Sequence, residues 1–304
     1  MEKLKINRIK IWMICAVCAI TVSSCVYGNP DEDWERNGRV RLHLDWRSHD
    51  SYPADMAYYF YKDGALRPVV RLGSASGYEG SLLSGEYKVV VCNTDFDNIV
   101  LDMDKGYEQA CGKVRQISAL KSSSVHVARP DNFYGTGSLS IDVKGEETVV
   151  EELYPVNLVK TLELNIKISG SDTLRIDALS GHLTGVSSEI HIPTGENRFD
   201  RPAFILFEPE ATHKGGYASL LNIFGLSDGD SDGRVELHLN LAIKGGKKVT
   251  AFTDITEGVN KAFSQSISAH VILDLLVSYD EVNGMDISLE GWKEGSGEVG
   301  NWED

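Results

Sequence analysis

One acidic stretch has the spacing of a calcium-binding loop. Asp228, Asp230 and Asp232 alternate with small residues, and a glycine follows at position 233. Alternating carboxylates of this kind open an EF-hand loop, in which oxygen ligands surround Ca²⁺ and glycine supplies the sharp turn. The twelfth position of such a loop requires a bidentate glutamate but is Leu239 here. We therefore interpret the stretch as an acidic hairpin loop, with a Ca²⁺ site completed by Glu236 or a distant carboxylate as the alternative.

The other polar residues form no recognisable catalytic group. The 8 histidines are scattered, without a pair at the helical spacing of a metal site and without His-Glu-x-x-His. Phosphate-binding glycine loops and Cys/His constellations are also missing from the sequence. His43 and His238 fall on the polar faces of strand-like segments, so we expect both at the surface. The sequence indicates a non-enzymatic protein without a cofactor.

Two cysteines in the body of the chain could form a disulfide. Cys92 ends the apolar run 89–91 and has the setting of a core residue, whereas Cys111 lies in a polar stretch. An oxidising compartment would allow them to pair. The sequence does not decide between a disulfide and two free thiols.

The N-terminus has the features of an export signal. Four basic residues precede the apolar residues 11–22, a run of about 12 residues that is too short to span a membrane. The tetrapeptide that ends at Cys25, Val-Ser-Ser-Cys, resembles the lipobox of bacterial lipoproteins, in which the cysteine is acylated and cleavage falls just before it. We predict a lipoprotein signal peptide at residues 1–24 and a lipid-anchored Cys25. The alternative is an ordinary secretory signal that happens to end in cysteine.

Charge excludes one class of partner and suggests a location. Residues 1–24 carry four basic residues and one acidic residue, so their removal takes the formal net charge from −15 to −18. Such a chain repels nucleic acid. Asp31, Glu32 and Asp33 resemble the surface-export tether of Bacteroidota lipoproteins, although a solvated linker would look similar. We predict an acidic tether at residues 25–37 and a cell-surface protein held in the outer membrane by Cys25.

Residues 38–155 have the pattern of a first β-sandwich domain. Val40, Leu42, Leu44 and Trp46 alternate with polar residues, which predicts a half-buried antiparallel strand. Further strands are expected at residues 57–61, 69–72, 138–143 and 146–153, with a turn at residues 62–64. Residues 83–91 have the pattern of a tight turn that leads into a buried central strand. Residues 93–121 have weak periodicity, so we expect loops there with a short helix near residues 107–111.

The pattern restarts after residue 155 and predicts a second domain at residues 156–304. Leu162, Leu164, Ile166 and Ile168 alternate with polar residues in its opening strand. Other strands are expected at residues 176–183, 203–207, 217–224, 235–243, 249–253 and 267–277, with a helical turn near residues 259–263. Helical stripes long enough for an α/β fold are missing. The fold class predicted is all-β, with two antiparallel sandwiches in tandem.

Several motifs along the exported chain point to one family. They are the lipobox at Cys25, the first strand at residues 38–46, Asp63-Gly64, Gly85-Glu86-Tyr87, residues 129–135, Leu179-Ser180-Gly181, Phe224-Gly225, residues 254–256 and Gly291-Trp292. Together they resemble the fimbrillin-related lipoproteins of Bacteroidota, which include the anchor subunits of fimbriae. The resemblance implies two transthyretin-like β-sandwich domains. It also implies a fimbrial anchor or minor structural subunit whose partners are other fimbrial subunits.

The same resemblance implies assembly by β-strand addition, in which an extended strand from one subunit pairs with an open edge of the next. In polymerising fimbrillins similar to this chain, a protease removes the first strand after a basic residue, whereas anchors are thought to keep theirs. Arg36, Arg39 and Arg41 flank or lie in the first strand and are the candidates for processing. Protection of a strand edge is the alternative role for these basic residues.

The C-terminal tail, residues 285–304, is the candidate donor or final edge strand. Ile287 and Leu289 share one face of it, and Trp292 follows. The alternative is that this strand pairs only within its own domain.

A surface glycan-binding or scaffold lipoprotein of a nutrient-uptake system is the alternative function. Six aromatic residues could include a stacking platform for sugar rings: Trp34, Trp46, Tyr58, Tyr59, Tyr61 and Tyr78. We favour a core position for Trp46, Tyr59 and Tyr61. The tripeptide centred on Thr173, Asp-Thr-Leu, resembles the O-glycosylation acceptor of Bacteroidota, with a plain turn as the alternative.

Overall fold

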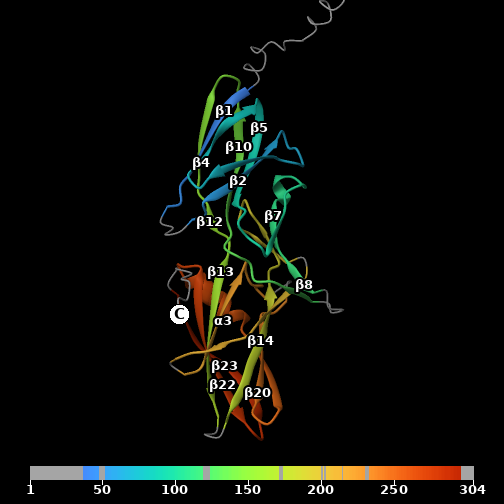
Figure 1. Cartoon of the computed structure of the whole chain (residues 1–304), viewed down its shortest axis with the longest axis vertical. Helices are drawn as coiled ribbons and strands as arrows, with labels where there is room; N and C mark the ends of the chain where they lie inside the picture. Colours follow the sequence, from blue (N-terminus) through green and yellow to red (C-terminus); the bar gives the residue numbers. More distant parts are fainter. Residues whose placement is uncertain are drawn as a thin grey trace, which may run out of the picture.

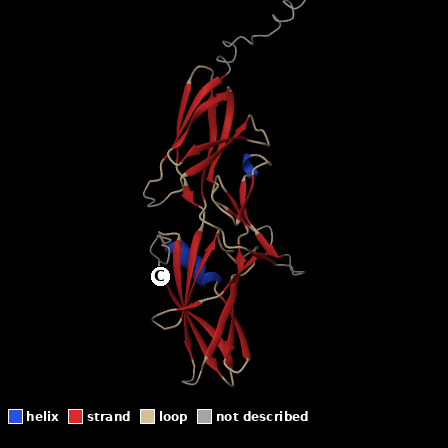
Figure 2. Cartoon of the chain, viewed as in Figure 1, coloured by secondary structure: helices blue, strands red, loops and turns tan. Residues whose placement is uncertain are grey.

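The computed structural model describes residues 37–47, 52–118, 124–170, 174–199, 201, 203–213, 215–229 and 233–295. Apart from a short 3₁₀ helix, η1 (Tyr107–Gln109), and one α-helix, α3 (Thr256–Gln265), the elements described are strands (Figure 2). This confirms the all-β fold class. No helix among the described residues is long and apolar enough to cross a membrane. Several predicted features lie outside the described residues; they are the signal peptide, Cys25, Asp31, Glu32, Asp33, Trp34, Arg36, Thr173, Asp230 and Asp232.

The first half of the chain forms a sheet that closes over its own core. Across the sheet the strands are β11 (Thr148–Leu153), β1 (Asn37–Leu44), β4 (Gly77–Leu83), β3 (Val69–Ser74), β2 (Asp55–Lys62), β5 (Gly85–Asn93), β10 (Tyr134–Val143) and β12 (Val156–Asn157). The ladder is interrupted between β3 and β4, which pair only at Ser74 and Gly77. Both sides of this interruption contribute buried side chains to one core, so the sheet behaves as a sandwich.

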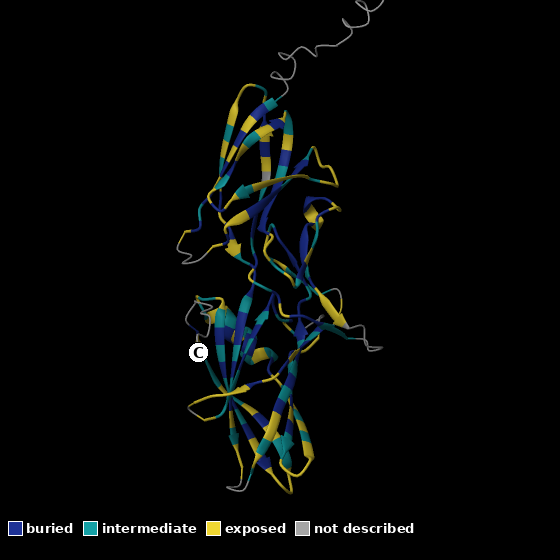
Figure 3. Ribbon diagram, viewed as in Figure 1, coloured by how far each residue is buried: buried dark blue, intermediate teal, exposed yellow. Residues whose placement is uncertain are grey.

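The alternating sequence of β1 produces the half-buried strand that was predicted. Val40 and Leu42 are 0% and 1% exposed, whereas Arg39 and Arg41 face solvent, and the same alternation is visible along other strands in Figure 3. Full burial of such an aliphatic side chain stabilises a fold by about 1.5–3 kcal/mol. The sequence pattern therefore reports which face of β1 meets the core.

The turn after β2 is also as predicted. Asp63 and Gly64 have φ angles of 49° and 74°, in the left-handed region that glycine and aspartate tolerate. The Asp63 carboxylate also accepts a hydrogen bond from the backbone N–H of Glu86 at 3.1 Å. This contact fixes the turn against the start of β5.

The stretch expected to be mostly loop contains three strands, which corrects that prediction. β6 (Ile99–Asp102), β7 (Cys111–Val114) and β8 (Gln116–Ser118) lie there, and η1 corresponds to the short helix expected nearby. β6 and β7 join two strands from the second half in the order β16 (Asn197–Arg198), β15 (Glu189–His191), β7, β6. The strands are too short to show a period of two, and pairing with a distant segment stabilises them.

The second half consists of two further sheets. One has the order β18 (Glu210–Ala211), β19 (Tyr217–Ile223), β13 (Lys160–Ser169), β22 (His270–Asp280) and β23 (Gly284–Glu294). The other has the order β21 (Lys247–Asp254), β20 (Glu236–Ile243), β14 (Ile176–Val186), β17 (Ala203–Phe207), β9 (Val125–Val127) and β8. The strands predicted in this half are present, and the predicted helical turn is part of the longer α3.

Three strand pairs among the described residues are parallel, which corrects the expectation of purely antiparallel sheets. They are β1 with β11, β13 with β22, and β17 with β9. The opening strand of each half has the same surroundings, with one antiparallel neighbour and one parallel neighbour from much later in the chain. Long connections permit this arrangement, because a parallel pair needs a crossover that returns the chain to the same end.

The two halves lie end to end along the long axis of the molecule and exchange strands where they meet (Figure 1). β8 and β9 precede residue 155 but extend a sheet of the second half, while β15 follows it but pairs with β7 on one side and with β16 on the other. The larger core cluster contains Tyr61 from the first half together with Leu237 from the second. The boundary proposed between residues 38–155 and 156–304 therefore coincides with no break in strand pairing.

Candidate assembly and binding surfaces

β1, the first described strand, lies between two neighbours. It pairs antiparallel with β4 and parallel with β11, so that Arg39 lies opposite Thr148 and Ser81. The Arg41 guanidinium contacts the Glu79 carboxylate at 2.8 Å. The hydrogen bond and positive charge of Arg41 hold the pKa of Glu79 below its usual value. Removal of β1 would expose two strand edges and the apolar groove that its buried side chains fill.

β23, the last described strand, lies at the edge of its sheet and pairs only with β22. Ile287 is 5% exposed and lies opposite Val277, and Leu289 is partly buried opposite Leu275. A bulge follows, so that Trp292 lies opposite the buried Leu273. In this structure the candidate donor strand is therefore paired within its own half of the chain.

A groove of about 1310 Å³ lies between α3 and β23. Leu289, Gly291 and Trp292 line one side, and the start of α3 lines the other. The Asp254 carboxylate beside α3 accepts hydrogen bonds from the Thr256 N–H and hydroxyl, at 3.0 and 2.6 Å. These hydrogen bonds, led by that of the Thr256 hydroxyl, lower the pKa of Asp254.

The acidic loop before β20 contributes only its first residues to the described structure. Asp228 is exposed and lines the groove, whereas Asp230 and Asp232 lie outside the described residues. Among the residues that the structure describes, no group of three or more His, Cys, Asp or Glu side chains could hold a metal ion. The Ca²⁺ alternative stays a prediction.

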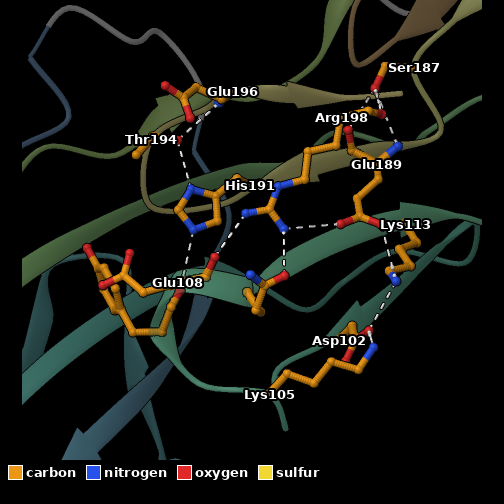
Figure 4. A network of polar contacts seen from close by, with 12 residues as sticks. Asp102, Lys105, Glu108, Lys113, Ser187, Glu189, His191, Thr194, Glu196 and Arg198 are labelled. Carbon is orange, nitrogen blue, oxygen red and sulfur yellow. Dashed lines mark hydrogen bonds and ion pairs between the residues drawn. The ribbon is translucent and has the colours of Figure 1, made fainter. Parts of the chain in front are cut away.

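A polar network joins the two halves at the sheet formed by β7 and β15 (Figure 4). The Glu189 carboxylate lies 3.2 Å from the Lys113 ammonium and 3.4 Å from the Arg198 guanidinium, and Lys113 also contacts Asp102 at 3.1 Å. Burial alone would raise the pKa of Glu189, but hydrogen bonds from Cys111, Lys113 and Arg198 and the charge of Lys113 lower it on balance. Arg198 also donates to the Glu108 carbonyl at 2.9 Å, which ties β16 to η1.

The network brings together a cysteine, a histidine and a carboxylate, yet its chemistry is that of a structural contact. Cys111 is 1% exposed, and burial together with Glu189 raises the pKa of its thiol to about 12. A thiol of this kind stays protonated at neutral pH and is a poor nucleophile. His191 accepts or donates one hydrogen bond with the Thr194 hydroxyl at 2.8 Å, and burial lowers its pKa. Cys92 and Cys111 are both buried free thiols, so the disulfide left open by the sequence does not form here.

The aromatic residues singled out in the first half mostly fill cores. Trp46, Tyr58, Tyr61 and Tyr78 are between 0% and 8% exposed, and Tyr59 is partly buried against the larger core. This confirms the core interpretation of Trp46, Tyr59 and Tyr61. They form no exposed platform for a sugar.

A row of rings that the sequence did not reveal crosses the sheet of β21, β20, β14, β17 and β9. Phe252 stacks on His238 with ring centroids 5.2 Å apart, and His238 stacks on His182 at 4.2 Å. The row continues through Phe204 to His126. Burial and then the neighbouring His238 lower the pKa of His182. His238 is thus partly buried against rings instead of freely exposed, whereas His43 is exposed as expected.

Comparison with known proteins identifies a family without an assigned function. A family model described as a domain of unknown function, DUF5119, matches residues 25–208. No curated protein matches the sequence.

Three solved structures illustrate the fold. A candidate adhesin from Bacteroides ovatus has a TM-score of 0.61 at 20% identity, and the match covers 79% of this chain and 89% of that one. The fimbrial anchor protein Mfa2 from Porphyromonas gingivalis has a TM-score of 0.58 at 11% identity, covering 84% and 97%. Candidate polysaccharide-binding proteins from Bacteroides thetaiotaomicron have a TM-score of 0.54 at 13% identity, covering 86% and 99%. These likenesses confirm the resemblance to fimbrillin-related proteins at the level of the fold.

Proposed function

The chain belongs to the DUF5119 family, and from that premise we propose that it is a non-enzymatic cell-surface subunit of a fimbria, either the anchor or a minor structural subunit. The proposal is supported by the fold that the chain shares with a fimbrial anchor protein. It is supported further by the positions of β1 and β23, which suit assembly with other fimbrial subunits by strand addition.

Membrane attachment is assigned in this proposal to the N-terminus. Residues 1–24 are removed, Cys25 carries the lipid, and residues 25–37, with Asp31, Glu32 and Asp33, form the tether at the outer membrane. Each buried CH₂ of an acyl chain contributes about 0.8 kcal/mol, so several chains together hold a soluble domain. Because β1 begins at Asn37, the tether leads directly into the first strand.

The observation that carries the proposal is the position of β23. In the part of the chain that the structure describes, it is an edge strand with a single paired neighbour, β22. Such a strand can leave its sheet by breaking one ladder, whereas a central strand must break two. Ile287 and Leu289 alternate with polar residues, so one face of β23 would fill an apolar groove in the next subunit. We assign β23 the role of donor strand.

Processing at the candidate sites would remove at most part of β1. Cleavage after Arg36 would leave it whole, while cleavage after Arg39 or Arg41 would cut within it. Two ladders and a buried stripe hold β1 in place. We propose that the subunit keeps β1, as an anchor would.

Mass spectrometry of the intact protein from outer-membrane vesicles tests both assignments. We expect a whole chain that begins at acylated Cys25, and the same spectrum reports any glycan at Thr173. An N-terminus that begins after Arg36, Arg39 or Arg41 would instead identify a processed, polymerising subunit.

Two variants test the donor role. A chain that lacks residues 284–304 should reach the surface but fail to join fimbriae, provided that circular dichroism shows a folded protein. The matched control is Arg39→Gln with Arg41→Gln, which removes two processing candidates and should leave assembly unchanged. Normal incorporation of the truncated chain would exclude β23 as the donor.

The groove between α3 and β23 favours glycan binding as a second candidate function. Trp292 supplies a partly exposed ring there, and charged and amide side chains surround it, as in many sugar sites. If β23 left its sheet, this groove would be lost. Strand donation therefore requires β23 to leave the sheet, whereas glycan binding requires it to stay. Quenching of Trp292 fluorescence by soluble oligosaccharides, lost in Trp292→Ala, would support binding. Unchanged fluorescence with a broad panel of neutral and acidic glycans would count against it.

A further inference from the structure

β3 has an open edge in the first half of the molecule. On one side it pairs with β2, from Val69 opposite Phe60 to Ser74 opposite Asp55. On the other side it meets β4 only where Ser74 lies opposite Gly77, and β4 continues along β1. Among the described residues, no strand pairs with this edge from residue 69 to residue 73. A strand edge of this kind presents unpaired N–H and C=O groups.

The side chains along this edge are unusually exposed for a β-strand. Val69, Val70 and Leu72 are 42%, 46% and 77% exposed, although they are aliphatic. The Val70 carbonyl accepts a hydrogen bond at 3.2 Å from the guanidinium of its own neighbour, Arg71. An exposed apolar edge strand is a template for pairing with another chain, which is why proteins usually cover or shorten such edges. The edge of β3 is neither covered by a described element nor limited to two or three residues.

The edge is also basic within an acidic protein. Residues 64–76 contain Arg67 and Arg71 and no Asp or Glu, whereas the whole chain has a formal net charge of −15. Opposite charges on paired strands stabilise the pair and like charges destabilise it. An acidic strand therefore suits this edge. A second copy of the same edge would bring basic residues together and suits it less well.

We propose that the β3 edge binds an extended acidic segment of another protein by β-strand addition. The incoming strand would pair with the backbone of residues 69–73, place apolar side chains beside Val70 and Leu72, and place carboxylates near Arg67 and Arg71. This edge is separate from β1 and β23. Its test is therefore independent of the fimbrial assignment.

Two synthetic peptides of equal length test the proposal directly. One alternates valine with glutamate and the other alternates valine with lysine, and each is labelled and titrated with the full exported chain by fluorescence anisotropy. We expect the acidic peptide to bind at least about tenfold more tightly at low salt, with a smaller difference at high salt because exposed charges are screened. Hydrogen exchange should slow at amides of residues 69–73 when the acidic peptide is present.

Charge reversal makes the test specific. Arg67→Glu with Arg71→Glu should reverse the preference between the two peptides. The control, Lys244→Glu with Lys248→Glu, makes the same change of charge at exposed positions in the second half and should leave the preference unchanged. The proposal is overturned by absence of acidic-peptide binding at millimolar protein, by protection outside β3, by a preference that survives reversal, or by a dimer that forms through β3 without peptide.

Discussion

Replacement of Glu189 with alanine should destabilise the entire chain, because this carboxylate joins its two halves. The side chain is 8% exposed and contacts Lys113 and Arg198, which are 38% and 28% exposed. Loss of one partner from a fully buried ion pair costs about 3–5 kcal/mol, whereas exposed pairs contribute about 0–1 kcal/mol. Because the two cations can regain water, and Lys113 keeps Asp102, we expect a cost near 2 kcal/mol.

Thermal unfolding and hydrogen exchange measure this effect together. A loss of about 2 kcal/mol corresponds to a fall in the midpoint of roughly 4–8 °C for a domain of this size class. Exchange should accelerate first at β7 and β15, whose pairing the network supports. Glu196→Ala is the matched control, since its exposed carboxylate makes no ion pair in the described structure and its loss should change the midpoint little.

Two results would refute the reasoning. One is a thermal unfolding midpoint for Glu189→Ala that equals the midpoint of the Glu196→Ala control. The other is additivity of Glu189→Ala and Arg198→Ala, because residues in one network usually show a coupling of about 0.5–3 kcal/mol.

The pKa of Glu189 is lowered in the folded protein, so its contribution to the free energy of unfolding depends on pH. This contribution is present above the carboxylate's unfolded pKa and is lost as pH falls through the folded value.

Three other outcomes follow from the same structure. Burial lowers the pKa values of His126, His182 and His191. Their contribution to stability should therefore be constant above about pH 6.5 and fall as pH drops below it, because the unfolded chain takes up protons first. Urea unfolding at pH 7.5 and 5.5 checks this, and equal stability would contradict it. Fragments cut at residue 155 should lack a sharp urea transition, because each loses strands that the other supplies; a cooperative transition in either fragment would show independent folding. Cys92 and Cys111 should react with a thiol reagent only as fast as the chain opens, and rapid modification of the native protein would show exposed thiols.

Strands with a clear period of two could be predicted from sequence, together with the faces they bury. Leu162, Leu164 and Ile166 in β13 are 0–1% exposed, as their alternation indicates. Their spacing encodes burial locally, because side chains alternate across a strand whatever its partner. The partner itself is not encoded in this way. For that reason the parallel neighbours and the exchange of strands between the halves were missed.

The candidate surfaces show the same division between local and distant information. The apolar face of β23 could be predicted from Ile287 and Leu289, because they stand two residues apart in one strand. The network at Glu189 depends on β7 and β15, which are brought together only by the fold. Each ring in the row through His182 comes from a different strand, so no local window of sequence contains two of them. The open edge of β3 likewise depends on where β4 goes after its turn.

The parallel pairing of β1 with β11 sets an order of events during synthesis. β1 leaves the ribosome first, and β11, which flanks it on one side, follows roughly 100 residues later. At a synthesis rate of 5–20 residues per second, this delay is about 5–20 s. β13 has the same relation to β22 in the second half. Both opening strands therefore have one unpaired edge until most of their half of the chain has been synthesised. During that interval each unpaired edge can pair with another chain.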